Sequence, residues 1–221
     1  MKNKRLVIFG TGDIAQIAKY YFDIDSDLEV EAFTVDQAYL TTDTFEGKPV
    51  VPFESIEKHF PSSDFLLFVA LSYKNMNKAR AAKYLEAKDK GYALASYVSS
   101  KCTYLSQFKP GDNCLIFENN TIQPFVRIGN NVTFWSGNHI GHHSTVEDHN
   151  FVSSHVVISG HCHIEPYCFL GVNATLHNNV RVATENLIGA GSIISKSTLP
   201  KEVHLPAKST LFGKKSDEIK F

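Results

Sequence analysis

A large apolar residue recurs at every sixth position through the second half of the chain, with a single exception at Pro110. This spacing matches neither the helical period of about 3.6 residues nor the two-residue alternation of a simple strand. It predicts a parallel β-helix, in which each hexad forms a short strand with its corner and three hexads close a triangular coil of about 18 residues. The recurring residues are Tyr104, Ile116, Ile122, Ile128, Phe134, Ile140, Val146, Val152, Ile158, Ile164, Leu170, Leu176, Val182, Ile188 and Ile194.

In most hexads a small or modest side chain stands two residues before the large one. The hexads between residues 102 and 197 make roughly five coils, more than the about three repeats that a continuous solenoid core requires. All four cysteines fall on the small position, so we expect buried, reduced thiols that act as small hydrophobic side chains. Because no Cys-x-x-Cys occurs, we expect neither a zinc site nor a disulfide framework. The small positions are Cys102, Cys114, Val126, Val132, Ser144, Val156, Cys162, Cys168, Ala174, Val180 and Ser192.

Short apolar runs alternate with helical patterns before the hexads begin. This alternation is typical of βαβ units with a parallel sheet, so we predict a Rossmann-like α/β domain over residues 1–98. Residues 99–221 then form the solenoid domain with a C-terminal tail. The predicted strands cover residues 4–9, 30–35, 64–71 and 92–98, and the helical patterns cover residues 16–22 and 75–88.

A glycine turn follows the first predicted strand and precedes the first helix. Gly10 and Gly12 would let backbone N–H groups approach an anionic group at the helix N-terminus. Asp36 ends the second strand, roughly where this fold places an acid near a ribose or a base edge. We therefore predict a nucleotide site built on Gly10, Gly12 and Asp36. The lone glycine motif does not specify a nicotinamide cofactor, and another kind of nucleotide is an equally good ligand.

Composition narrows the class of partner. The 221 residues include 43% apolar ones, enough for packed cores, and a formal net charge of −1 gives no electrostatic reason to expect nucleic acid or an anionic membrane. No apolar run approaches the about 20 residues of a membrane span, and the N-terminus shows no signal-peptide core. The expectation is a soluble, cytoplasmic protein.

Histidines gather in one part of the solenoid, six of them between residues 142 and 163. His143, His149, His155 and His161 take the last place of their hexads, which is a corner, and the 18-residue coil predicts that His143 and His161 stack on adjacent coils. Three interpretations stay open: polar corner residues without a role, a metal cluster, or a catalytic base. No two histidines are five residues apart, the spacing of the zinc ligands in solenoid enzymes of the γ-carbonic anhydrase type, so no metal is expected.

A family resemblance rests on several motifs taken together. With these motifs the chain resembles the sugar acyltransferases of the sialic-acid and bacillosamine O/N-acetyltransferase family, over nearly its whole length. Lys78-Ala-Arg80 also stands where that family has a basic helix start. The motifs are Gly10-x-Gly12, Asn138-His-Ile-Gly-His142-His143-Ser-Thr-Val, Cys168-Phe-Leu-Gly171-Val-Asn173-Ala and Leu187-Ile-Gly189-Ala-Gly191-Ser.

The resemblance implies a left-handed β-helix, a homotrimer, acetyl-coenzyme A in the groove between neighbouring solenoids, and a nucleotide-linked sugar held by the N-terminal domain. It also implies that His142 is the general base. The family often places Glu or Asp at the next position to orient the imidazole, whereas this chain has His143. Glu118, Glu147 and Asp148 are the nearby acids that could take that role.

The remaining site residues are expected to bind the two substrates. A corner glycine such as Gly160 can expose an N–H to an oxyanion or thioester, and Gly189 with Ala190 would let the coenzyme run close along the backbone. Lys78 is added to the nucleotide-sugar residues by the resemblance. The resemblance, taken with these features, implies an acetyl-CoA-dependent N-acetyltransferase that acts on a nucleotide-linked deoxyamino sugar for bacterial surface polysaccharide or lipopolysaccharide. A sugar O-acetyltransferase and a non-catalytic nucleotide-sugar scaffold remain as alternatives.

Overall fold

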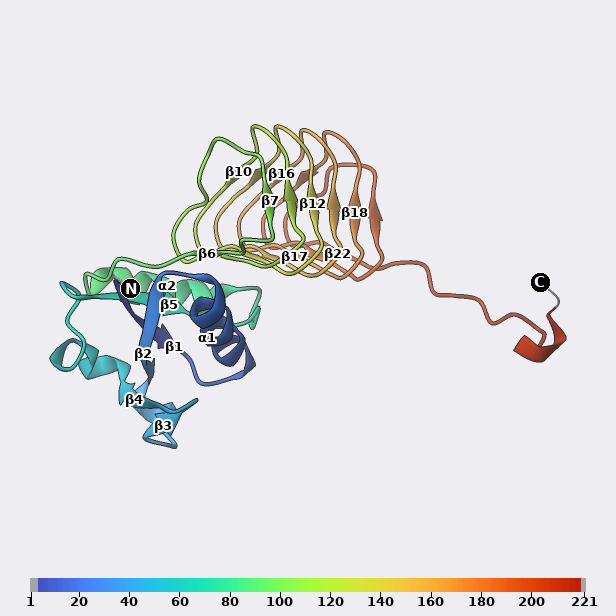
Figure 1. Cartoon of the computed structure of the whole chain (residues 1–221). Coiled ribbons are helices and arrows are strands. Elements are labelled where there is room, and N and C mark those ends of the chain that lie inside the picture. The colour runs from blue at the N-terminus through green and yellow to red at the C-terminus, as the bar shows by residue number, and fades with distance from the viewer. Residues whose placement is uncertain (1–3, 220–221) are drawn as a thin grey trace.

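In the computed structural model, which describes residues 4–219, a small α/β unit packs against one face of a long solenoid (Figure 1). The α/β unit comprises five strands and two helices between Lys4 and Asp89. The solenoid follows it and stacks its coils side by side, and the C-terminal segment runs away from the last coil (Figure 1). Three short 3₁₀ helices complete the secondary structure: η1 (Gln37–Tyr39), η2 (Phe53–Lys58) and η3 (Ser216–Glu218).

The sheet of the α/β unit has the strand order β3-β4-β2-β1-β5. Strand β3 runs antiparallel to β4, and the other neighbouring pairs are parallel. The first strand has the predicted bounds, while the second begins two residues earlier than the apolar run indicates. The strands are β1 (Lys4–Phe9), β2 (Leu28–Val35), β3 (Thr44–Phe45), β4 (Lys48–Pro52) and β5 (Phe65–Val69).

Alternation along the interior strand β1 places one helix on each face of this sheet. Ile8 joins a buried cluster with Phe22 of the first helix, whereas its neighbour Phe9 joins a second cluster with Tyr84 of the other helix. Successive side chains of a strand point to opposite faces, so a continuously apolar strand must be covered on both sides. The helices are α1 (Asp13–Asp25) and α2 (Lys78–Asp89).

Helix α2 starts three residues later than its sequence pattern predicts. Asn75, Met76 and Asn77 all have positive φ, at 54°, 49° and 64°, and form a left-handed turn that the right-handed helix cannot include. The buried Asn77 side chain donates from Nδ2 to the carbonyl oxygen of Cys168 at 3.0 Å. This hydrogen bond holds the left-handed turn against the solenoid.

The strand predicted at residues 92–98 is wrong in its length and in its sheet. Only Tyr97–Val98 forms a strand, β6, and it pairs with β8 of the solenoid rather than with the α/β sheet. Leu94 keeps a single bridge to Leu67 of β5. The Ser96 hydroxyl accepts a hydrogen bond from the backbone N–H of Cys114, which draws the chain onto the first coil. The last apolar run thus leads out of one sheet into another.

The solenoid consists of three sheets of two-residue parallel strands in 18-residue register. Thr133 pairs with Phe151 and Phe134 with Val152, and this offset of 18 residues holds between successive coils up to the last strand, where Val203 pairs with Leu187. The domain-facing sheet contains β6, β8 (Leu115–Ile116), β11 (Thr133–Phe134), β14 (Phe151–Val152), β17 (Phe169–Leu170), β20 (Leu187–Ile188) and β22 (Val203–His204). The second sheet contains β7 (Thr103–Tyr104), β9 (Thr121–Ile122), β12 (His139–Ile140), β15 (Val157–Ile158), β18 (Thr175–Leu176) and β21 (Ile193–Ile194). The third contains β10 (Arg127–Ile128), β13 (Thr145–Val146), β16 (His163–Ile164) and β19 (Arg181–Val182).

The predicted inward positions form the solenoid core. Every large hexad residue from Ile116 to Ile194 is buried, and Tyr104 packs partly buried against them. All four cysteines are free thiols, three of them buried and Cys102 half-buried. The exception at Pro110 lies in residues 105–114, which form no strand, since proline lacks the N–H that a ladder requires. The hexad prediction is confirmed, and the stacked sheets fit a left-handed β-helix.

The outer face of the domain-facing sheet is the one that the α/β unit covers. Leu115 and Phe117 join the cluster of Phe22, and Phe151 is buried beneath Tyr73 of the loop that follows β5. The α/β unit lies along β6 and β17 in the lower part of Figure 1, away from the corner that joins the other two sheets.

The C-terminal segment extends the domain-facing sheet by one strand before it leaves the solenoid. Val203 pairs with Leu187, and the chain beyond Leu205 is exposed as far as Glu218. The last residue of the predicted tail, Phe221, lies outside the described residues. Among residues 4–219, no helix combines the length and apolar character that crossing a membrane requires.

Candidate active site

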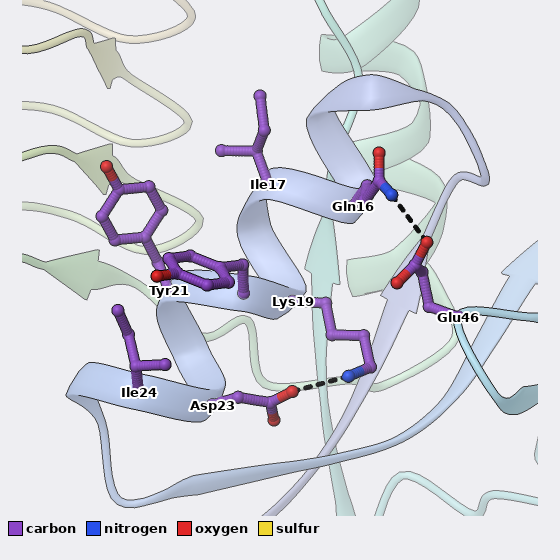
Figure 2. Close-up of a pocket in the computed structure, with 8 residues that line it drawn as sticks. Gln16, Ile17, Lys19, Tyr21, Asp23, Ile24 and Glu46 are labelled. Atoms are coloured by element: carbon purple, nitrogen blue, oxygen red, sulfur yellow. Dashed lines mark hydrogen bonds and ion pairs between the residues drawn. The ribbon is translucent and has the colours of Figure 1, made fainter.

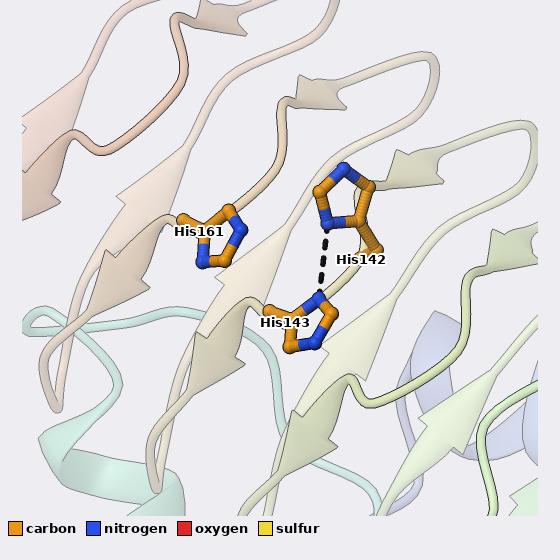
Figure 3. A group of neighbouring side chains, drawn as sticks. All are labelled: His142, His143 and His161. Atoms are coloured by element: carbon orange, nitrogen blue, oxygen red, sulfur yellow. Dashed lines mark hydrogen bonds between the residues drawn. The ribbon is translucent and has the colours of Figure 1, made fainter.

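Three exposed histidines gather at the corner where the second sheet turns into the third. His142 and His143 follow β12, and His161 follows β15 at the equivalent corner of the next coil (Figure 3). Neither sheet at this corner faces the α/β unit, so the cluster lies at the vertex of the triangular coil opposite the domain-facing sheet. The left-handed backbone of His143 and His161, with φ of 61° and 58°, makes both corners.

The two adjacent histidines form a hydrogen-bonded pair. Nδ1 of His142 lies 3.1 Å from Nδ1 of His143, and the ring planes are nearly perpendicular. Only one of these nitrogens can carry the shared hydrogen, because a neutral imidazole has one N–H and one acceptor nitrogen. When His142 donates, its Nε2 keeps a free lone pair that can accept a proton. The backbone N–H of His142 is held by Oε1 of Gln123 at 2.8 Å.

Gly160 provides the surface on which the His142 ring rests. A methyl group at Gly160 would lie 2.8 Å from Cε1 and 2.9 Å from Nε2 of His142. The N–H of Gly160, to which the sequence assigned an oxyanion, donates instead to Oδ1 of Asn178 at 2.9 Å. An oxyanion would have to displace that amide oxygen. In this structure Gly160 leaves room for the imidazole.

The predicted stacking of His143 and His161 is confirmed. Their ring centroids are 4.8 Å apart with an angle of 9° between the planes, and the N–H of His161 donates to the carbonyl oxygen of His142 at 2.9 Å. The ring of Phe125 covers the other side of His143, with centroids 4.5 Å apart. The His143 ring is thus held between an aromatic ring and a second imidazole.

The acids that were candidates to orient His142 have other partners. Glu118 accepts hydrogen bonds from the hydroxyls of Tyr21 and Ser136, each at 2.7 Å. Glu147 pairs with His163, and Asp148 accepts from the backbone N–H of Asn130. Of the hydrogen bonds between side chains in the described chain, the one that reaches the His142 ring comes from His143. In this structure none of the three candidate acids is hydrogen-bonded to the His142 ring, whereas His143 is.

The two residues predicted for the coenzyme lie at a different corner from His142. Gly189 and Ala190 follow β20, between the domain-facing and second sheets. Gly189 is buried beneath the C-terminal strand, with its N–H donated to the carbonyl oxygen of His204 at 2.7 Å. Ala190 stays exposed. Within one chain Gly160 lies next to His142, whereas Gly189 and Ala190 lie at another corner.

The glycine turn predicted for the nucleotide lies at the carboxyl edge of the α/β sheet. Gly10 has a φ of 118°, and a side chain there would meet the carbonyl oxygen of Ala70 at 2.9 Å, so only glycine fits. Gly12 is the N-cap of α1 and has open space around it. Backbone N–H groups of the first helical turn lack intrahelical partners, which makes this edge suited to an anion.

The two charged residues predicted for the nucleotide sugar are engaged in ion pairs. Asp36 accepts from Nζ of Lys83 at 2.6 Å, and Lys78 donates to Glu185 of the solenoid at 2.6 Å. Lys78 thus joins α2 to the solenoid. A ligand that used either group would have to compete with its partner.

A pocket between the α/β unit and the solenoid was not predicted from the sequence. It measures about 230 Å³ and opens beside the first turn of α1, at Ile14. Tyr73 and Trp135 line it together with Phe151. The signal in the sequence was the chain's one tryptophan, which stands at a polar corner next to the inward Phe134. Aromatic faces at such a position can stack on a planar ring.

A second hollow follows the outer side of α1 (Figure 2). Gln16, Tyr21, Ile24 and Glu46 line a pocket of about 530 Å³, and Gln16 donates to the Glu46 carboxylate at 2.7 Å. Burial and the hydrogen bond to Glu118 raise the pKa of Tyr21 to about 12, so this hydroxyl is a hydrogen-bond donor at neutral pH. The hollow places polar and aromatic groups next to the solenoid.

Comparison with solved structures identifies this architecture. No protein-family model and no curated protein matches the chain. The acetyltransferase domain of PglB from Neisseria gonorrhoeae matches with a TM-score of 0.80 at 18% identity, over 91% of this chain and 96% of that chain. PerB from Caulobacter crescentus, in complex with CoA and GDP-perosamine, matches with a TM-score of 0.76 at 20% identity, over 92% and 95%. WeeI from Acinetobacter baumannii matches with a TM-score of 0.74 at 16% identity, over 90% and 94%. The chain has the fold of these hexapeptide-repeat sugar N-acetyltransferases, over nearly its whole length.

Proposed function

We propose that this protein is an acetyl-CoA-dependent N-acetyltransferase that acts on the amino group of a nucleotide-linked deoxyamino sugar. The observation that carries the proposal is the exposed His142–His143 pair, with Nε2 of His142 free to accept a proton, on a fold shared with N-acetyltransferases. Perosamine N-acetyltransferase, one of the structures with this fold, is in complex with CoA and GDP-perosamine. The product would enter bacterial surface polysaccharide, and both substrates point to a cytoplasmic reaction.

The chemistry requires one base and two well-oriented substrates. The sugar amine attacks the thioester carbonyl, Nε2 of His142 takes the amine proton as the C–N bond forms, and the C–S bond then breaks. The proton passes to the departing thiolate, which leaves as coenzyme A. General base catalysis of this kind contributes about 10²–10⁴-fold, and orientation of the substrates contributes much of the remainder.

His143 holds the reacting imidazole in one orientation in this proposal. By accepting the Nδ1 hydrogen of His142, it fixes the tautomer whose Nε2 faces solvent and stabilises the imidazolium that forms. A carboxylate would do so with a full charge. The tilted Phe125 ring and the stacked His161 ring restrain His143 in place of that charge.

The position of His142 supports a homotrimer. The α/β unit covers the domain-facing sheet, whereas His142 lies at the opposite vertex of the coil, so a sugar held by the α/β unit cannot reach His142 of the same chain. A neighbouring copy can supply that histidine. Acetyl-CoA would then lie in the groove between two solenoids, with the exposed Ala190 corner of one copy facing Gly160 and His142 of the next.

The N-terminal part of the chain is proposed as the nucleotide-sugar domain. We place a Rossmann-like domain at residues 1–98 and the acyltransferase solenoid at residues 99–221. The parallel strand order β4-β2-β1-β5 supports this, since ligands of such sheets bind at the carboxyl ends of the strands. Gly10 and Gly12 lie at that edge, close in sequence to Ile14 of the aromatic pocket. Asp36 and Lys78 would take part by exchanging their present partners.

A substrate panel tests the proposal. Purified protein with acetyl-CoA is incubated with UDP-, dTDP- and GDP-linked amino sugars, each beside its hydroxyl counterpart, and free thiol is measured. Thiol release with an amino sugar, and none with the matched hydroxyl sugar, is the expected result. Release with the hydroxyl sugars alone would show O-acetylation. Nucleotide-sugar binding without any binding of acetyl-CoA would show a scaffold, and either outcome would overturn the proposal.

A further inference from the structure

The histidine cluster brings three metal-ligating groups together at one vertex. His142, His143 and His161 each offer a ring nitrogen, and these atoms all lie within 4.8 Å of one another (Figure 3). All three side chains are exposed. The cluster combines two sequence neighbours with a residue one coil away, so it exists only in the folded solenoid.

We propose that His142, His143 and His161 form a site for a divalent transition-metal ion such as Ni²⁺ or Zn²⁺. Imidazole nitrogen suits Zn²⁺, Ni²⁺ and Cu²⁺, whereas Mg²⁺ and Ca²⁺ prefer oxygen ligands. Three histidines with water in the open position are a sufficient zinc ligand set. The ligands here are three imidazoles, and the nearby acids Glu147 and Asp148 are paired with His163 and Asn130.

The geometry needs only small side-chain movements. At metal–nitrogen distances of about 2.0–2.1 Å, the nitrogens of a tetrahedral site are roughly 3.4 Å apart. His142 and His143 already bring their Nδ1 atoms to 3.1 Å, so the main adjustment is a rotation of His161 out of its stack on His143. The ladder between the coils, including the bond from the His161 N–H to the carbonyl oxygen of His142, fixes the backbone.

Metal binding has a consequence that rests on the proposed function. An ion bound to a ring nitrogen of His142 either takes up the lone pair that would accept the amine proton or turns the ring away from the substrate. The metal-bound protein therefore cannot use His142 as its base. The bound ion would also hold His143 away from its hydrogen bond with His142. Occupancy of the site therefore switches the enzyme off, and a chelator restores it.

Direct titration tests the site without any substrate. Tag-free protein, first stripped with a chelator, is titrated with NiCl₂ by calorimetry at pH 7.5. Saturable binding of one ion per chain is expected, and the His161→Asn variant should bind at least about tenfold more weakly. His155→Asn serves as the matched control, because His155 is also exposed at a left-handed corner, with φ of 58°, but lies outside the cluster. No saturable binding by the wild type, or equal weakening in both variants, would overturn the proposal.

A second assay separates this proposal from the proposed function. Acetylated sugar is measured by mass spectrometry, once with chelator and once with excess Ni²⁺. Each protein is compared with its own rate in chelator, and His161→Asn should lose a smaller fraction of that rate in Ni²⁺ than the wild type loses. Metal binding without acetyl transfer in chelator would retain the site and reject the function. Acetyl transfer with no metal binding would retain the function and reject the site.

Discussion

The imidazole of His142 rests on the backbone of Gly160, one coil away, where a methyl group on Gly160 would lie 2.8 Å from Cε1. This contact links two residues to which sequence analysis assigns separate roles. Gly160 has no positive φ that would require glycine. The reason for glycine at this corner is therefore space for the histidine ring.

The substitution Gly160→Ala should disable the site without unfolding the protein. The added methyl group would push the His142 ring out of position, and we expect turnover to fall by about 10²-fold, since a displacement near 1 Å can have that effect. Steady-state thiol release measures the turnover, and circular dichroism tests whether the variant stays folded. In a His142→Ala background, Gly160→Ala should lower turnover no further, because the ring that the methyl group displaces is absent. Equal losses in both backgrounds would show that Gly160 acts by another route.

His143 should behave as a positioning residue. His143→Phe removes the acceptor for the Nδ1 hydrogen of His142 while keeping a ring beside Phe125, and we expect kcat to fall about 10–100-fold with KM little changed. His143→Glu supplies a carboxylate acceptor and should recover most of the rate, with a pH profile shifted to a more basic value. A His143→Glu variant as poor as His143→Phe would show that the pair does not orient the base.

Much of the architecture could be predicted because apolar residues recur in the sequence with a fixed period of six. The hexads specify which residues point inward, and the interval of 18 residues places His143 beneath His161. The contacts between the α/β unit and the solenoid carry no such period. The ion pair of Lys78 with Glu185 spans 107 residues, and the hydrogen bond from Asn77 to the carbonyl oxygen of Cys168 spans 91. Asn75, the start of the left-handed turn before α2, shows no local signal strong enough to exclude a helix.

A buried arginine connects α2 to the solenoid and should be a main determinant of stability. Nε of Arg80 donates to Oδ1 of Asn131 at 3.1 Å, and a terminal nitrogen donates to the carbonyl oxygen of Asn150 at 3.0 Å. Burial lowers its pKa to about 10, so the guanidinium remains charged at neutral pH. Arg80→Met would remove these charged hydrogen bonds, although Asn113 still donates to Oδ1 of Asn131 and Thr133 to the Asn150 carbonyl oxygen. The loss should cost about 3 kcal/mol of unfolding free energy.

Urea denaturation compares that loss with a control on the same helix. Lys78→Met removes an exposed ion pair to Glu185, which is worth about 0–1 kcal/mol, so its unfolding midpoint should stay close to that of the wild type. If both variants unfold at the same urea concentration, the hydrogen bonds of Arg80 do not hold the two parts of the fold together.

His149 should make stability depend on pH. Burial lowers its pKa below the ordinary value of 6.5, and Nδ1 accepts a hydrogen bond from Asn131 at 2.9 Å. Above pH 6.5 the residue is neutral in both states and has no effect. As the pH falls below 6.5, the unfolded chain binds the proton first, so stability is lost down to the folded pKa. Melting temperatures from pH 7.5 to 5 should fall less for His149→Asn than for the wild type, while exposed His177→Asn follows the wild type.

The rate of acetyl transfer by His142→Asn tests the central claim most directly. Asparagine keeps a polar side chain on Gly160 but cannot take a proton at neutral pH. With the amino sugar that the panel identifies, we predict a loss of about 10²–10⁴-fold in kcat, with acetyl-CoA binding and the oligomeric state unchanged. A variant that turns over at the wild-type rate would contradict the account and remove His142 from the reaction.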